Sequence, residues 1–232
     1  MNMLHIDWGV LEKTISSHVK GAIVLLCLQP STAYALGKFL KAKGIVKDAA
    51  VVRQYVIALK KARILISVKK EGRGRIIVKT DVEGVYGCFA DRLGLSFKDK
   101  KLLTETVSVV GSDFAKWFEE ALKDAYLVAA KLKDKRYKCT LPFLPLNFDL
   151  MVYLALPLAF AASMSPQLEG ALEGYVEHDS FKQWKGVLRF RISPKTAEWL
   201  TASGNEIVSL TKKVLSKILS EKIGILSFIM QF

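Results

Sequence analysis

The stretch that decides the fold is residues 32–84, which read TAYALGKFLKAKGIVKDAAVVRQYVIALKKARILISVKKEGRGRIIVKTDVEG. Its first part predicts two helices, over residues 33–43 and 49–64, because apolar residues recur there at helical spacing. Thr32 and Asp48 are suited to cap these helices, since their short side chains can accept a backbone N–H of the first turn. Gly44 supplies the stop between them. Two helices joined by a short glycine-containing turn form a helix-turn-helix pattern.

The second of these helices has two different sides. Its apolar stripe follows the i, i+3, i+4, i+7 spacing that predicts packing against a core, and it consists of Val52, Tyr55, Val56 and Leu59. The opposite side starts at Ala50 and presents Arg53, Gln54, Ile57 and Lys61. Of these four, Ile57 fits the core equally well, so its placement stays open.

A β-hairpin is expected directly after this helix. Residues 64–68 and 76–79 are apolar and rich in β-branched side chains, and the segment between them contains Gly72 and Gly74, which allow a tight turn. The tip is strongly basic and has one acid, Glu71; its cations are Lys69, Lys70, Arg73 and Arg75. A helix over residues 82–93 should follow, capped by Thr80-Asp81 and closed by Gly94.

Outward from this segment, the pattern is mostly helical. Upstream, Asp7 is expected to cap a helix over residues 8–19, and an apolar segment follows over residues 21–28. Downstream, we expect helices over residues 99–110 and 113–133, loops over 131–138 and 170–179, a strand over 188–192, a short helix over 194–201 and a last helix capped by Asn205. The last helix carries an apolar stripe of Ile207, Leu210, Val214 and Ile218, and an apolar tail over residues 223–232 ends the chain.

The positive charge is concentrated in one part of the chain. The 232 residues carry a formal net charge of +13, and residues 38–79 alone contain 13 basic and two acidic residues, a net +11. Such a segment repels itself unless an anionic partner is expected there, so its composition favours a nucleic acid or an anionic surface as partner.

The order of elements over residues 20–95 resembles the winged-helix family of DNA-binding proteins, in which a helix pair is followed by a β-hairpin wing. The resemblance covers about a third of the chain, and the Gly-Arg-rich tip between two strands is its most specific part. It implies that the second helix of the pair enters the major groove, where Arg53, Gln54 and Ile57 would face base edges. Phosphate contacts are implied for Lys38, Lys41, Lys43, Lys60 and Lys61, and wing contacts for Lys69, Lys70, Arg73 and Arg75.

The expected fold class is therefore mainly α with a β-hairpin wing. We expect a winged-helix domain over residues 1–95 and a larger, mostly helical domain over residues 96–232 that dimerises or senses an effector, which is either a protein or a small molecule. The apolar tail favours a homodimer, since it is too apolar to be left in water.

No enzyme, cofactor or metal site is expected. His5, His18 and His178 are isolated, and the three cysteines Cys27, Cys88 and Cys139 lie far apart among apolar neighbours, so they indicate reduced core thiols. The apolar stretch over residues 148–164 has an uninterrupted part of about 14 residues, shorter than the roughly 20 that cross a bilayer. It predicts a buried helix or two short core segments, and a membrane-associated hairpin is the alternative.

These observations predict a sequence-specific transcriptional regulator that binds double-stranded DNA. The alternatives are a replication or partition initiator and an architectural DNA-binding protein with the same winged helix. Asp7, Trp8 and Glu12 interrupt the apolar core that a signal peptide needs, so a cytoplasmic, nucleoid-associated location is expected.

Overall fold

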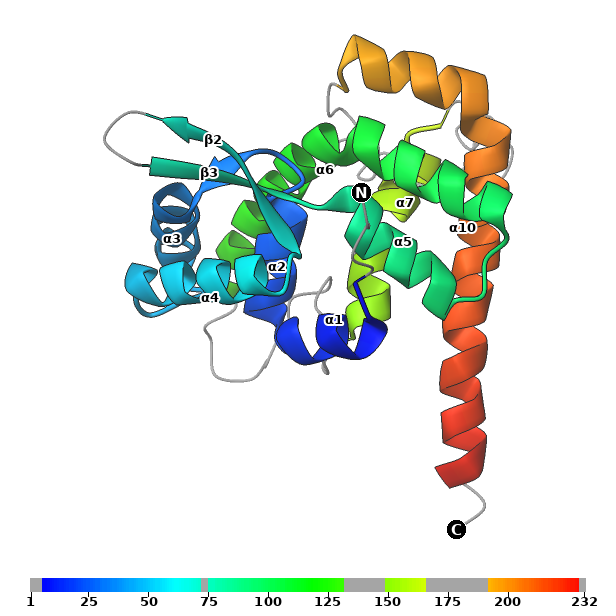
Figure 1. The fold of residues 1–232 in the computed structure, drawn as a ribbon, viewed down its shortest axis with the longest axis horizontal. Coiled ribbons are helices and arrows are strands. Elements are labelled where there is room, and N and C mark those ends of the chain that lie inside the picture. The colour runs from blue at the N-terminus through cyan, green and yellow to red at the C-terminus, as the bar shows by residue number, and fades with distance from the viewer. Residues whose placement is uncertain (1–5, 72–74, 132–148, 166–191, 230–232) are drawn as a thin grey trace.

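The structure, a computed structural model, describes residues 6–71, 75–131, 149–165 and 192–229. Within these ranges the chain is mainly helical with one small antiparallel sheet, as expected (Figure 1). The elements are α1 (Trp8–Thr14), α2 (His18–Leu26), β1 (Ser31–Thr32), α3 (Ala33–Ala42), α4 (Ala49–Lys61), β2 (Leu65–Glu71), β3 (Arg75–Thr80), α5 (Val82–Arg92), α6 (Phe97–Lys131), α7 (Leu150–Ser163) and α10 (Pro194–Ile229). The loops and the strand expected over residues 132–138, 170–179 and 188–191 lie outside the described residues.

The prediction of a single helix over residues 8–19 is wrong. The chain forms α1 and then α2, because the Ser17 side chain accepts a hydrogen bond from the Lys20 backbone N–H and starts a new helix. Helix α2 takes in most of the apolar segment over residues 21–28, whose residues are all buried.

The break expected between residues 110 and 113 is also wrong, since α6 runs through it. Gly111 lets α6 approach Leu28 closely, as an added Cβ would lie 3.3 Å from the Leu28 Cβ. Asp113 does not cap its own helix. Its carboxylate accepts hydrogen bonds from the Ser193 N–H (2.9 Å) and the Thr196 hydroxyl (2.7 Å), which ties the start of α10 to α6.

Helix α10 replaces the two helices expected over residues 194–201 and from Asn205 onward, so that expectation is wrong as well. Figure 1 shows a bend in the first third of α10, within the region where the sequence predicts a break. Asn205 lies inside the helix and is exposed, so it caps nothing. Beyond the bend, the stripe of Ile207, Leu210, Val214 and Ile218 is buried against the body of the protein.

The apolar stretch over residues 148–164 forms one buried helix, α7, capped by Asp149. Pro157 lies inside α7, where it cannot donate the backbone bond that a helix interior normally contains. Burial against α6 and α10 offsets that loss, since Tyr153, Leu154, Leu158 and Ala161 are almost completely inaccessible.

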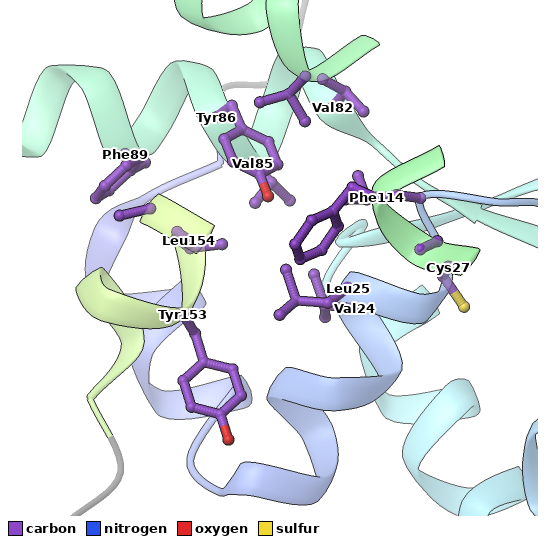
Figure 2. Close-up of a cluster of buried hydrophobic side chains, with 14 of the residues drawn as sticks. Val24, Leu25, Cys27, Val82, Val85, Tyr86, Phe89, Phe114, Tyr153 and Leu154 are labelled. Atoms are coloured by element: carbon purple, nitrogen blue, oxygen red, sulfur yellow. The ribbon is translucent and has the colours of Figure 1, made fainter. Parts of the chain in front are cut away.

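A continuous hydrophobic core joins the N-terminal and C-terminal parts. Its largest fully buried side chains include Tyr86 and Phe89 of α5, Phe114 of α6 and Tyr153 of α7, and Figure 2 shows them gathered with Val24 and Leu25 of α2. The core therefore draws on residues from both sides of position 95. A division into two domains at that position stays a prediction.

Candidate nucleic-acid interface

The helix pair α3–α4 is held by an unusually close contact. An added Cβ at Gly37 of α3 would lie 2.8 Å from the backbone oxygen of Ala49, where α4 begins. Glycine thus allows the two helices to touch, and Leu36 and Leu40 of α3 are buried beside this contact. Gly44 takes a positive φ of 68° in the turn between the helices, a conformation that glycine adopts without strain.

Helix α4 shows the two sides that its sequence predicts. Val52, Val56 and Leu59 are buried, and Tyr55 is half-buried with the Lys20 ammonium 5.7 Å from its ring centre. The solvent side consists of Ala50, Arg53, Gln54, Ile57 and Lys61. Ile57 is 46% exposed, so it belongs to this outer face and not to the core.

The hairpin β2–β3 projects beside this helix pair, and β1 pairs with its inner strand in the order β1-β3-β2 (Figure 1). Its base is fixed to α2, because the Thr80 hydroxyl donates to the Val24 carbonyl at 2.6 Å and the Thr80 N–H donates to the Cys27 carbonyl. A bulge between Ser67 and Lys69 shifts the register, so that Lys69 lies opposite Ile77.

The cations of this region have no acidic partner within the described part of the chain. Among the cations expected to contact phosphates or to lie on the wing, Lys38, Lys41, Lys61 and Lys69 are exposed, and Lys43 and Lys60 are half-buried. None of these six forms an ion pair with a described carboxylate. Lys70 and Arg75 lie in β2 and β3 near the tip, and Arg73 lies outside the described residues.

Three further cations share this environment and were not among the expected contacts. Lys47 and Arg63 are exposed, Lys79 is half-buried, and none of them pairs with a described carboxylate. The signal for them was present in the sequence, because all three lie within the basic segment of residues 38–79.

Several cations elsewhere in the described structure have acidic partners. Arg92 of α5 makes two hydrogen bonds to the Glu221 carboxylate, at 2.9 and 3.1 Å. Lys213 pairs with Asp99, and the Lys217 ammonium donates to the Leu93 carbonyl at 2.7 Å. Figure 1 places α10 on the opposite side of the molecule from α3, α4 and the hairpin. Among the described residues, the cations of α3, α4 and β2 therefore lack the acidic partners that several cations near α10 have.

The two cysteines among the described residues, Cys27 and Cys88, are buried. Burial raises the pKa of Cys27 to about 12, and burial together with Asp7 and Asp91 raises the pKa of Cys88 to about 11, so both thiols stay protonated near neutral pH. No group of three or more His, Cys, Asp or Glu side chains in the described ranges is placed to hold a metal ion.

A small cleft lies where α3 meets α6, but its size does not favour a ligand. It is lined by Leu36 and Phe39 of α3 and by Ala115 and Glu119 of α6, among others, and its volume is about 180 Å³. Ligand pockets usually measure about 300–1,000 Å³. The effector expected for the C-terminal region therefore gains no support from this cleft.

Comparison with family models, with curated proteins and with solved structures found no match for this chain. Among the described residues, no helix has both the length and the apolar character needed to span a bilayer.

Proposed function

We propose that this protein is a sequence-specific regulator that binds double-stranded DNA through a winged helix formed by α2 to α5. The observation that carries the proposal is the group of cations on α3, α4 and β2 that pair with no described carboxylate, next to the exposed outer face of α4. Lysine and arginine side chains held in this way gain most from an anionic polymer, because each phosphate they contact releases condensed counterions.

The outer face of α4 supports reading of bases as well as phosphates. Arg53 and Gln54 are both exposed, and these side chains can form paired hydrogen bonds with guanine and adenine, respectively, in the major groove. The exposed Ile57 offers an apolar contact for a thymine methyl group. A purely architectural protein would not need side chains that read bases, so their combination on α4 favours a regulator. A replication or partition initiator would use the same surface, and it remains the alternative.

A homodimer is part of the proposal, because two copies read two half-sites and raise the specificity of a small reading surface. With the Ile207–Ile218 stripe buried inside the protein, a different face of α10 supports pairing. Leu215 and Leu219 are one turn apart, and both are exposed, Leu219 by 57%. In Figure 1 the C-terminal half of α10 extends away from the body of the protein. We propose that this face of α10 meets the same face of a second copy.

The first experiment measures the salt dependence of binding by the full-length protein to a short duplex. Contact with about 4 to 6 phosphates should give a log–log slope of roughly −4 to −5. Lys41→Ala should reduce the slope by about one. The control is Lys98→Ala, which removes an exposed lysine on α6 far from the cluster and should leave the slope unchanged. A nearly flat slope for the wild type would remove nucleic acid from the proposal.

The second experiment is a selection of binding sites from random duplexes, again with the full-length protein. A regulator should enrich a palindromic site, whereas an architectural protein should enrich none. Arg53→Ala should then relax the preference at one base position and weaken the preferred site by about 1–3 kcal/mol. If Arg53→Ala changes neither affinity nor preference, the outer face of α4 is not the reading surface.

A further inference from the structure

The turn between α4 and β2 contains an arginine in a backbone conformation that arginine rarely adopts. Arg63 has a φ of 61°, and among the described residues no other non-glycine residue has a positive φ. This left-handed conformation brings the Cβ atom too close to the next carbonyl oxygen, and glycine, which lacks a Cβ, adopts it freely. A glycine would therefore suit position 63 better if the backbone alone mattered.

Hydrogen bonds and buried neighbours hold the backbone at Arg63 in this conformation. The Arg63 N–H donates to the Lys60 carbonyl at 3.0 Å, and the Ile64 N–H donates to the Leu59 carbonyl at 2.9 Å, which closes the end of α4. Leu59 and Ile64 are both fully buried, so the core holds the two sides of the turn in place. An outlier that its surroundings impose in this way points to a role for the side chain.

The Arg63 side chain is exposed, and its charge is not neutralised by any described carboxylate. It lies between the two elements that would touch DNA: Lys60 and Lys61 precede it in the last turn of α4, and Lys69 follows in β2. A guanidinium binds phosphate through two parallel hydrogen bonds, which a backbone amide of glycine cannot replace.

We propose that Arg63 binds a phosphate of the duplex beside the groove that α4 enters, at the expense of chain stability. This inference rests on the DNA binding proposed above. A cation near the C-terminal end of a helix also interacts favourably with the helix dipole. The test must therefore separate a charge that stabilises α4 from a charge that contacts DNA.

The experiment compares Arg63→Gly and Arg63→Lys in the full-length protein, with two measurements. The first is the urea midpoint of unfolding, and the second is the affinity for a short duplex of arbitrary sequence over a range of salt concentrations. Arg63→Gly should raise the urea midpoint, because the strain is removed. It should also weaken binding about ten-fold and reduce the salt slope by about one. Arg63→Lys keeps both the charge and the strained backbone, so its salt slope and urea midpoint should match the wild type.

Two results would overturn the inference while leaving the proposed function intact. One is an Arg63→Gly protein that binds with wild-type affinity and slope. The other is an Arg63→Gly protein that is less stable than the wild type, which would show that Arg63 is not kept at the expense of stability. A wild-type protein that binds no duplex would instead remove the proposed function itself. Should Arg63→Gly fail to fold, Arg63→Asn gives the same comparison, because asparagine also tolerates this conformation.

Discussion

Two buried tyrosines should respond in opposite ways to the same chemical change. Tyr86 is completely buried, and its hydroxyl has no hydrogen-bond partner among the described residues. Figure 2 shows that hydroxyl pointing among the hydrocarbon of Val85, Leu154 and Phe114. Tyr153 has instead a hydrogen bond of 2.9 Å between its hydroxyl and Nδ1 of His18. Removal of the hydroxyl in each case tests whether these two environments differ as the structure shows.

The expected magnitudes follow from the partners of each hydroxyl. An unsatisfied buried hydroxyl costs about 1–3 kcal/mol, so Tyr86→Phe should raise the free energy of unfolding by about 1–2 kcal/mol after a small loss of packing contacts. Tyr153→Phe removes a made hydrogen bond and should lower the free energy of unfolding by about 0.5–1.5 kcal/mol. Since a protein of this size shifts its Tm by about 2–4 °C per kcal/mol, the two variants should differ by about 3–14 °C.

The assay is urea unfolding and calorimetry of both variants and the wild type at one protein concentration. Burial raises the pKa of the Tyr86 phenol, so this group is neutral throughout the usual range. Its effect should therefore not change between pH 6 and pH 8, a window whose upper end is about two units below the ordinary tyrosine pKa. The reasoning is refuted if Tyr86→Phe is less stable than the wild type, because the hydroxyl would then have a partner in the core.

Three further predictions concern packing, pH dependence and assembly. Gly37→Ala should lower the free energy of unfolding by about 1–3 kcal/mol, because the added Cβ would push α3 away from α4. In Gly87→Ala the added Cβ meets only the flexible end of a lysine side chain at 3.4 Å. That variant should be neutral or stabilising in urea unfolding. Burial raises the pKa of Asp113, but hydrogen bonds from Ser193 and Thr196 outweigh it and lower the pKa overall. The wild type should therefore lose stability relative to Asp113→Asn as pH falls below about 4, and equal loss in both would contradict this assignment. Leu219→Glu should convert a dimer to monomers in sedimentation, while Ser220→Glu, which is exposed and turned away from Leu215 and Leu219 around the helix, should not. A wild-type monomer at tens of micromolar would refute pairing through α10.

The structure of residues 32–84 could be predicted from the sequence, because the sequence signals for its helices and hairpin are local. The stripe of Val52, Val56 and Leu59 predicts which side of α4 is buried, and Asp48 and Asp81 predict where α4 and α5 begin. The hairpin follows from two β-branched runs around glycines. Each of these signals lies within a few residues of the structure it specifies, so no distant part of the chain is needed to interpret it.

The incorrect helix predictions have the opposite cause, since they depend on contacts between residues far apart in the sequence. Asp113 looks like the start of a helix, but its partners Ser193 and Thr196 are about 80 residues away in sequence. Helix α6 passes the expected break because Gly111 meets Leu28 across the core. A local pattern cannot report such contacts, and they outweigh the modest preference of a single residue to cap or break a helix.

For the candidate interface too, some properties follow from the sequence alone and others only from the tertiary structure. By itself, the sequence determined that most of the net charge falls in residues 38–79 and that Arg53, Gln54 and Ile57 share one side of a helix, since both properties depend on composition and on the helical repeat. Only the tertiary structure decided which charges are neutralised: Arg92 meets Glu221 across 129 positions, whereas the cations of α3 and α4 meet no described acid. Only the tertiary structure revealed the positive φ of Arg63, because the buried residues on both sides of the turn impose that conformation on it.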